Sequence, residues 1–299
     1  MTAMEQTNRP PPRLVSVVMP TYNGAATIDE QLTALAGQTY AGAWELIVAD
    51  NGSSDDTVAV AERRRDDLPQ MRIIAVSRGQ GVAVASNDGA AAAQGDFVVF
   101  CHQDDVADPA WLGAHAAAAQ RGDAVGGRND YTMLNDPLVT TWRPPQSQDG
   151  LPTAMRFLPY AVGANLGVWA DVLDAVGGWS EHRSYGGEDV DLCWRIQLAS
   201  YRLVYAPDAL MHFRFRSDIT ALRKQFTAFG RAEPHLFVAY RDQGAPASSL
   251  RSASRSWLWG LRHLPDLWSS EERKGIWVRT LAYRWGRLKG SIESRTVYL

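Results

Sequence analysis

The chain contains 299 residues, of which 45% are hydrophobic and 21% are charged, and its net charge is −3 at pH 7. These values are ordinary for one large folded α/β domain, or for one domain with a helical appendage. The small negative charge gives no reason to expect a nucleic-acid partner. No segment approaches the roughly 18 consecutive apolar residues that cross a bilayer. Residues 1–13 also lack the apolar core of a secretory signal.

The chain has two cysteines, Cys101 and Cys193, which are too few for a disulfide framework. Each lies in an apolar segment, so we expect two reduced thiols in the protein core. Disulfides are rare in the cytoplasm, where thiols stay reduced. We therefore expect a cytoplasmic protein.

The first part of the chain alternates between short apolar runs and helical patterns. Residues 1–13 are polar and proline-rich and predict a disordered lead-in. Thr27 and Glu30 then have the spacing of a capping box at the start of a helix. The four runs predicted as strands are residues 14–19, 45–49, 72–77 and 97–102. Strands separated by helices indicate an α/β fold with a mostly parallel sheet that helices cover on both faces.

Polar residues follow each of these four strands. In open α/β sheets, ligands bind beyond the carboxyl ends of the strands. We therefore expect these residues to meet at one rim of the sheet and to form a binding site. They are Thr21, Tyr22 and Asn23 after the first strand, Asp50 and Asn51 after the second, Arg78, Gly79 and Gly81 after the third, and Asp104 and Asp105 after the fourth.

The second part of the chain is less regular. Residues 128–152 form a long polar connection that we expect to be a loop. Two glycines at 186–187 precede a predicted helix at 188–199. Its first-turn acidic residues, Glu188 and Asp189, fit simple compensation of the helix dipole as well as a functional role. Asp191 and Arg195 are four residues apart and predict a structural ion pair on the helix.

Three residues have the chemistry of metal ligands. His102 and Asp104 are two apart at the end of a strand, so both side chains should point to one face. Carboxylate oxygens suit hard divalent cations, and Mn²⁺ also accepts imidazole. An Asp-Asp pair before a helix can equally be a solvated cap. His212 follows a predicted strand at 203–206, and on its own it is better explained as a buried histidine.

The C-terminal region is basic and rich in tryptophan. From Arg251 onward there are ten Lys and Arg residues and four Asp and Glu residues. The tryptophans of this region are Trp257, Trp259, Trp268, Trp277 and Trp285. Such helices can lie on an anionic membrane surface. The preferred interpretation is a helical cap whose tryptophans pack on the main domain or on a second subunit.

Several motifs in one order resemble family 2 glycosyltransferases over about residues 14–215. VVMPTYNG is similar to the opening nucleotide-binding strand of the family, and VADNGSSDDT is similar to its V-D-N-G-S-x-D-x-T segment. The stretch that ends in VVFCHQDD resembles the approach to the metal-binding D-x-D motif. AVGGWSEH and YGGEDVDLCWRIQLASYRLVYAPDALMH resemble the lead-in, the E-D helix and the strand that ends in a metal-ligand histidine.

The resemblance implies a GT-A-type domain that transfers a sugar from a nucleotide-diphosphate sugar to a saccharide or natural-product acceptor, with inversion. It implies Asp189 as the general base and Glu188 as its orienting partner. Asp104 and His212, with His102, would hold Mn²⁺ or Mg²⁺. The residues expected to bind the donor are Pro20, Thr21, Tyr22, Asn23, Asp50, Arg78, Gly81, Asn87, Asp104 and Asp105.

The resemblance also divides the chain. We expect a nucleotide-sugar-binding half at 14–127, an acceptor-side catalytic half at 128–216, and a helical C-terminal extension at 217–299. The extension could support a homodimer or a peripheral membrane contact.

The sequence departs from the family pattern at two positions. His102 stands where the family has the first aspartate of D-x-D, and Ser86 stands where an arginine often precedes Asn87. The first departure leaves the identity of the metal open. It also leaves open the alternative that the chain is a non-catalytic nucleotide-sugar-binding or scaffold protein. A sugar-phosphate nucleotidyltransferase is a further alternative, but residues 20–29 lack its glycine-rich loop.

Overall fold

The central strands β1 (Val15–Thr21) and β4 (Phe97–Phe100) are buried at every position, and they form the middle of one sheet. The computed structural model describes residues 9–68, 70–143, 149–182 and 186–299. β2 (Trp44–Asp50) pairs with β1, and β3 (Met71–Ala75) forms the edge beyond it. These four strands pair in parallel, as the sequence predicted.

The other half of the sheet is mixed. Its strands are β5 (Val106–Ala107), β6 (Ala124–Asp130), β7 (Leu166–Trp169) and β8 (Leu203–His212). The full order is β3-β2-β1-β4-β7-β6-β8-β5. β7 runs antiparallel to both β4 and β6, and β5 runs antiparallel to β8, whereas β6 and β8 are parallel. The predicted α/β fold with flanking helices is confirmed, with an antiparallel strand inserted at its centre.

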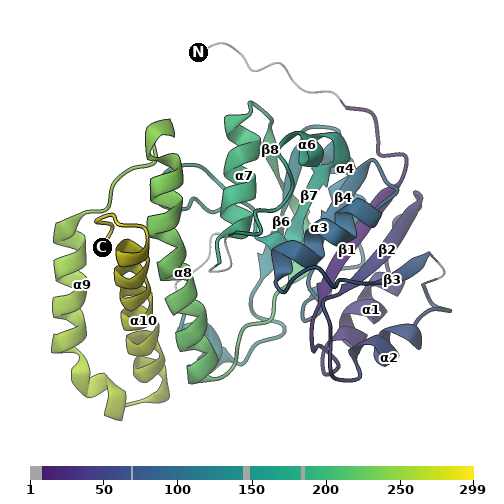
Figure 1. Ribbon diagram of the computed structural model, residues 1–299. Helices are drawn as coiled ribbons and strands as arrows, with labels where there is room; N and C mark the ends of the chain where they lie inside the picture. The colour runs from purple at the N-terminus through teal and green to yellow at the C-terminus, as the bar shows by residue number, and fades with distance from the viewer. Residues whose placement is uncertain (1–8, 69, 144–148, 183–185) are drawn as a thin grey trace.

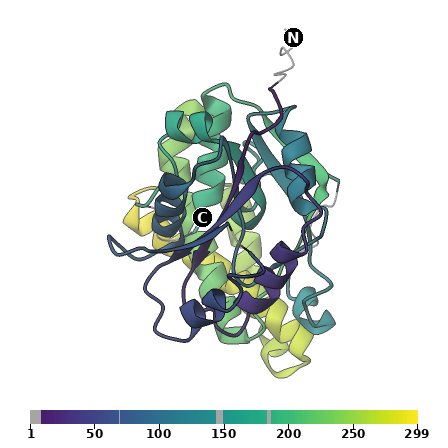
Figure 2. The same cartoon turned by 90° about the vertical axis from the view of Figure 1, so that its right-hand side faces the viewer.

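Short helices cover the sheet. They are α1 (Ile28–Ala36), α2 (Thr57–Glu62), α3 (Val82–Ala92), α4 (Trp111–Ala119), α6 (Ala170–Ala175) and α7 (Glu188–Leu198). α3 and α4 lie on opposite faces of the sheet (Figure 2). The capping box predicted for α1 is wrong. The Thr27 hydroxyl donates to the carbonyl oxygen of Gly24, and the Glu30 carboxylate accepts from Arg214.

The connection predicted at 128–152 is not a single loop. β6 continues to Asp130, and α5 (Pro137–Thr141) follows, capped by the side chain of Asp136. The pattern concealed β6 because its sequence, AVGGRND, contains two glycines. A Cβ at Gly126 would lie 2.6 Å from that of Ala161, and one at Gly127 would lie 2.3 Å from the carbonyl oxygen of Ala209. Close tertiary packing therefore requires glycine at these two positions, although two consecutive glycines in a sequence usually indicate a turn.

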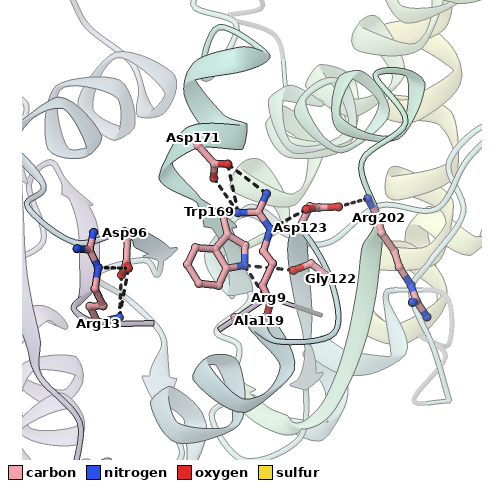
Figure 3. Close-up of polar contacts among 9 residues, drawn as sticks. All are labelled: Arg9, Arg13, Asp96, Ala119, Gly122, Asp123, Trp169, Asp171 and Arg202. Carbon is pink, nitrogen blue, oxygen red and sulfur yellow. Dashed lines mark hydrogen bonds and ion pairs between the residues drawn. The ribbon is translucent and has the colours of Figure 1, made fainter. Parts of the chain in front are cut away.

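The lead-in is held against the domain from Arg9 onward. Residues 1–8 of the segment predicted to be disordered lie outside the described residues. Arg9 donates to Asp123 at 2.9 Å and to Asp171 at 3.0 Å, and its guanidinium lies 4.9 Å from the centre of the Trp169 ring (Figure 3). Arg13 pairs with Asp96 at 3.0 Å. The prediction of disorder is therefore wrong for residues 9–13.

Three helices follow the sheet and stand beside it. They are α8 (Ile219–Tyr240), α9 (Leu250–Arg262) and α10 (Glu271–Glu293), with 3₁₀ turns η2 (Arg241–Gln243) and η3 (Leu264–Trp268) between them. α9 lies farthest from the sheet, and α10 lies between α9 and α8 (Figure 1). A Cβ at Gly286 would lie 2.1 Å from the carbonyl oxygen of Thr227, so glycine lets α10 approach the α8 backbone closely. Among the described residues, we find no helix with the length and apolarity needed to traverse a bilayer.

The C-terminal tryptophans divide into two groups. Trp257, Trp259 and Trp277 are half-buried, in line with the expected packing role. Trp268 and Trp285 are exposed, Trp268 to 78%. Only some of the tryptophans of the C-terminal helices are therefore packed, and Trp268 and Trp285 are not.

Candidate functional site

The loops after β1, β2, β3 and β4 are joined to one another, and we call residues 20–24, 50–53, 78–81 and 102–105 the donor rim. Asn51 is 4% exposed and is central to this connection. Its backbone N–H donates to the carbonyl oxygen of Thr21, and its side chain donates to Gly79 at 2.7 Å and accepts from Gly81 at 2.7 Å. Asn51 therefore links three strand ends in one residue.

The loop after β4 is tied to the loop after β1 in the same way. The Gln103 side chain accepts from the backbone N–H of Tyr22 at 2.9 Å and donates to the carbonyl oxygen of Tyr22 at 2.9 Å. Asn23, which has a φ of 47°, donates its N–H to the Ser53 hydroxyl. The predicted meeting of four strand ends at one edge is thus present in the structure.

Other residues expected at the donor occupy distinct positions on or beside this rim. Pro20 and Thr21 end β1 and are buried, whereas the Tyr22 side chain is half exposed. The Asp50 carboxylate accepts from the N–H of Ser53 at 3.2 Å. Gly81 adopts a φ of 133° at the start of α3. A donor-binding role for these residues remains a prediction.

Arg78 and Asn87 are engaged with a different partner. Arg78 pairs with Glu181 at 2.6 Å and also with Asp88. The Asn87 amide bonds to Glu181 at 2.6 Å and to the Trp179 backbone. Hydrogen bonds from Arg78 and Asn87 lower the pKa of Glu181 to about 2. These two residues therefore connect α3 to the segment before α7, and the sequence did not predict this network.

His102, Asp104 and Asp105 form a compact group of metal-ligand type at the end of β4. Their ligand atoms all lie within 4.8 Å of one another. Asp105 Oδ2 is buried and has no hydrogen-bond partner among the described residues. Burial and the neighbouring charge of Asp104 raise the pKa of Asp105 well above its usual range, and burial lowers the pKa of His102. A neutral imidazole with a free lone pair is the form that binds a metal.

Two arginines after β8 contact this group, and the sequence did not predict them. Arg216 Nη1 lies 3.1 Å from Asp104 Oδ2, and the N–H of Arg214 donates to Asp105 at 2.8 Å. Both belong to the run HFRFR at 212–216, whose alternation of aromatic and charged residues is the signal that could have found them.

His212 ends β8 directly beside the group. It pairs in the sheet with Val106, the residue after Asp105, and its Nδ1 lies 3.0 Å from Asp130 Oδ2. Although burial opposes it, hydrogen bonds from Thr132 and His212 lower the pKa of Asp130 to about 2. An imidazole held by a carboxylate through one nitrogen is the usual state of a metal-binding histidine. His212 is not part of the compact group of described ligands, so its role stays a prediction.

Glu188 and Asp189 begin α7, directly after Gly187 in the left-handed conformation with a φ of 83°. Asp189 accepts from the N–H groups of Val190 at 2.8 Å and Gly163 at 3.2 Å. Burial raises the pKa of Asp189, and these hydrogen bonds partly offset the effect. Burial also raises the pKa of Glu188 to about 7, with a contribution from Asp189. The predicted ion pair of Asp191 and Arg195 is confirmed at 2.8 Å.

Tyr131 connects the two sets of carboxylates. Burial raises its pKa to about 12, and the charges of Asp105 and Asp189 add to the effect. Tyr131 and Asp189 both line a cavity of about 790 Å³ that extends from the sheet to α8 and α10. A ligand in this cavity would therefore lie beside Asp189.

Comparison with known families identifies this arrangement. A sequence model of glycosyl transferase family 2 matches residues 16–177, which is more than half of the chain. The chain belongs to this family. A second model, of glycosyl transferase family group 2, matches residues 152–288. The glycosyltransferase AglE of Haloferax volcanii is 28% identical over 91% of this chain and 91% of its own length. The validoxylamine A glucosyltransferase of Streptomyces hygroscopicus is 33% identical over 77% of this chain and 64% of its own length.

Solved structures share the fold of this glycosyltransferase. The mannosyltransferase PcManGT from Pyrobaculum calidifontis, in complex with GDP-Man and Mn²⁺, has a TM-score of 0.64 at 20% identity, over 96% of this chain and 90% of its own. S. aureus TarS 1-349, in complex with UDP-GlcNAc, has a TM-score of 0.56 at 17% identity, over 95% of this chain and 93% of its own. The predictions of a family 2 enzyme, of a GT-A-type fold with C-terminal helices, and of glycosyl transfer are confirmed.

Proposed function

We propose that this family 2 glycosyltransferase takes its sugar from a nucleotide-diphosphate sugar at the donor rim and inverts the anomeric centre on transfer. The acceptor, a saccharide or natural product, presents a hydroxyl group to Asp189. The observation that carries the proposal is that Tyr131 lines the same cavity as Asp189, while the adjacent residue Asp130 contacts His212 beside the metal-ligand group. The metal-ligand group and the proposed base thus lie on either side of the same region. The attack of an acceptor hydroxyl on the donor sugar requires the two substrates to be held next to each other in this way.

The donor rim suits a nucleotide because its parts are already fixed. Asn51 and Gln103 hold the loops after β1 to β4 by hydrogen bonds that exist before any ligand enters. Little conformational entropy of the protein is then lost when a ligand binds. Complexes of PcManGT with GDP-Man and of TarS with UDP-GlcNAc support a nucleotide-sugar donor for a protein of this fold.

The residues at the end of β4 fit a divalent cation. Two carboxylates and a neutral imidazole form a donor set that suits Mn²⁺, and Mg²⁺ would rely on the carboxylates. Asp105 Oδ2 lacks a partner among the described residues, and Arg216 supplies positive charge to Asp104. We propose His102, Asp104 and Asp105 as ligands, with His212 as a further one. A bound cation would stabilise the negative charge that develops on the departing diphosphate.

Asp189 has the surroundings of a general base. Two backbone N–H groups fix the carboxylate, and the cavity gives an acceptor access to it. Burial raises its pKa, which brings its basicity closer to that needed near neutral pH. A single in-line displacement, in which the acceptor oxygen attacks opposite the leaving diphosphate, inverts the configuration of the sugar.

A panel of nucleoside diphosphates with and without Mn²⁺ tests the proposal. A ligand that binds only the native state raises the melting temperature. We expect at least one nucleotide to raise it more with Mn²⁺ than without, and the matching nucleotide-sugar to be hydrolysed or transferred. A protein that binds the nucleotide-sugar but never turns it over would contradict catalysis and favour the scaffold alternative.

We also propose that the enzyme acts in the cytoplasm and contacts an anionic membrane surface through α9. Both cysteines are buried and free, as expected for a reducing compartment. Leu258 and Leu261 on α9 are 66% and 71% exposed. The helix also carries Arg251, Arg255 and Arg262, and its sequence contains no acidic residue. Exposed leucines can insert into the acyl region of a membrane, and the arginines beside them can contact its anionic headgroups.

Co-sedimentation with phosphatidylcholine vesicles, with and without phosphatidylglycerol, tests the membrane contact. We expect binding only to the anionic vesicles, and its loss in the double variant Leu258→Ser, Leu261→Ser. Ile292→Ser, at another exposed apolar position, should bind as the wild type does. If the wild type binds neither vesicle but forms a dimer that the double variant loses, α9 contacts a second copy and the membrane proposal is wrong.

A further inference from the structure

The cavity beside Asp189 has a character that glycosyl transfer alone does not require. It lies between the sheet side, which contributes Tyr131 and Phe215, and the helices α8 and α10, which contribute Phe229 and Arg284. Its volume of about 790 Å³ is enough for a ligand of drug-like size. Because Asp189 lines it, a molecule inside it is in reach of the proposed base.

One wall of the cavity is aromatic. Tyr131 and Phe215 are stacked, with ring centres 5.1 Å apart and planes at 8°, and Phe213 meets both rings edge-on. On α8, Phe229 packs against Phe226 and is 43% exposed. Flat aromatic faces bind planar rings, apolar chains and the apolar faces of sugars.

Among the arginines that line the same cavity, the buried Arg143 and the half-buried Arg284 have no carboxylate partner in the described part of the chain. Arg143 is 8% exposed, and its hydrogen bonds go to the uncharged oxygens of Val139, Arg216 and Gln225. Its guanidinium lies 3.9 Å from the centre of the Phe215 ring. Burial, together with the charges of nearby arginines, lowers the pKa of Arg143 to about 10.

Arg284 is the second of these arginines. Its Nη1 is buried without a hydrogen-bond partner among the described residues. Burial, and then the charge of Arg287, lowers its pKa. Arg287 lines the cavity too but is neutralised, since its Nε lies 2.5 Å from Glu233. Within this wall Arg287 forms an ion pair with Glu233, whereas Arg284 forms no ion pair with any described residue, although the charge of Glu233 still raises its pKa in part.

A buried cation without a counter-ion is costly, and a ligand that supplies the negative charge removes the cost. Guanidinium groups bind phosphate and carboxylate by charge-assisted hydrogen bonds. We propose that the cavity is the acceptor site and that the acceptor is an anion, in which a phosphate or carboxylate is joined to a ring-bearing or apolar body. Arg284 binds the oxyanion, Arg143 adds positive charge, the aromatic wall holds the body, and a hydroxyl group faces Asp189.

This inference rests on the proposed function, because it assigns the acceptor of the same reaction. It also separates the two ends of the acceptor. The charged end lies against the helices α8 and α10, and the reacting hydroxyl lies at the N-terminus of α7. Neutral sugars lack the charged end and should occupy the cavity weakly.

Calorimetric titration with three probes tests the proposal. Phenyl phosphate has a ring and an oxyanion, phenyl β-glucoside has the ring alone, and inorganic phosphate has the oxyanion alone. Each is added to protein saturated with Mn²⁺ and a nucleoside diphosphate, so that the donor rim is occupied. We expect phenyl phosphate to bind at least about tenfold more tightly than either other probe, as the loss of a charge-assisted hydrogen bond or of ring burial predicts. Benzoate then distinguishes a carboxylate from a phosphate preference.

Variants of Arg284 make the test specific. Arg284→Gln should weaken phenyl phosphate binding about tenfold or more, and Arg284→Lys should retain part of it. Arg273→Gln, an exposed position on the same helix, should change nothing. Equal binding by the wild type and Arg284→Gln, with both folded by thermal melting, would overturn the proposal. So would tighter binding of the glucoside, or no binding of phenyl phosphate. Nucleotide binding in the presence of Mn²⁺ is measured first, and its failure would count against the proposed function instead.

Discussion

The donor rim and the cavity wall differ in how their polar groups are satisfied. On the donor rim, Asn51 and Gln103 bond to backbone groups of neighbouring loops, so the site is complete before a ligand arrives. In the cavity wall, Arg284 keeps a buried nitrogen without a partner among the described residues. One region is held rigid by the protein itself, whereas the other depends on a ligand to satisfy its charge.

We propose that this difference separates a donor site of shared chemistry from an acceptor site of variable chemistry. Donors of this reaction share a nucleoside diphosphate, so a rim built from short loops and backbone contacts can serve many sugars. The acceptor varies, and its proposed site is built from side chains of α8, α10 and several described segments between Tyr131 and Phe215 that share no local pattern. Variants that affect one region and leave the other intact therefore test this division.

The largest effect is expected at Asp189, where the two regions meet. Asp189→Asn removes the proposed base but keeps the size of the side chain, so transfer should fall about 100- to 10,000-fold. Binding of a nucleoside diphosphate should be unchanged, since the donor binds before the proton is removed. Steady-state kinetics and calorimetry measure the two quantities. Near-normal turnover would exclude Asp189 as the base, and Asp174→Asn, at an exposed acidic position, is the matched control.

A smaller effect is expected at Gly286, which belongs to the cavity side. Alanine normally favours a helix over glycine. Here the added Cβ would lie 2.1 Å from the Thr227 carbonyl oxygen, so α10 must move away from α8. We expect Gly286→Ala to lower the free energy of unfolding by about 1–3 kcal/mol, and to leave nucleotide binding intact in the folded protein. Urea denaturation measures the first quantity. Gly150→Ala, where a Cβ has no neighbour within 4 Å, should be neutral.

Asn51→Ala is the corresponding change on the donor rim. It removes the hydrogen bonds to the carbonyl oxygen of Gly79 and from the N–H of Gly81, and because both glycines are at least partly exposed, each lost bond should cost about 0.5–1.5 kcal/mol. The loops should loosen, so nucleoside diphosphate binding should weaken about tenfold while the cavity still binds phenyl phosphate. If both affinities fell together, the two regions would not be independent.

A further prediction concerns pH and Glu188. Its pKa of about 7 in the folded protein is above the ordinary value of 4.5 for a glutamate. Between these pH values the folded state binds more protons than the unfolded state, so stability falls as pH rises from 4.5 through 7. The difference in free energy of unfolding between Glu188→Gln and the wild type should therefore shift in favour of the variant by about 1–2 kcal/mol from pH 5 to pH 8. Urea denaturation at both values is the measurement, and Glu272→Gln, in the first turn of α10, should show no such difference. If the variant and the wild type showed the same pH dependence of stability, the pKa of Glu188 would not be raised in the folded protein.

The sequence predicted the donor rim well and the cavity poorly, for physical reasons. The rim depends on short segments such as VADNGSSDDT, in which strand, turn and polar residues are consecutive. Tyr131, Arg143 and Arg284 come from three distant segments, and each alone reads as an ordinary core or surface residue. β6 was missed because Gly126 and Gly127 serve tertiary packing rather than a turn. Only the alternation in HFRFR at 212–216 hinted at the aromatic and charged wall.

The central claim is that the group at the end of β4 holds the cation of the donor diphosphate. Titration of a nucleoside diphosphate into the wild type and into Asp104→Asn, with and without Mn²⁺, tests it most directly. We expect Mn²⁺ to strengthen binding to the wild type and to Asp174→Asn, and to have little effect on Asp104→Asn. Binding to Asp104→Asn that Mn²⁺ strengthens as much as in the wild type would contradict the account.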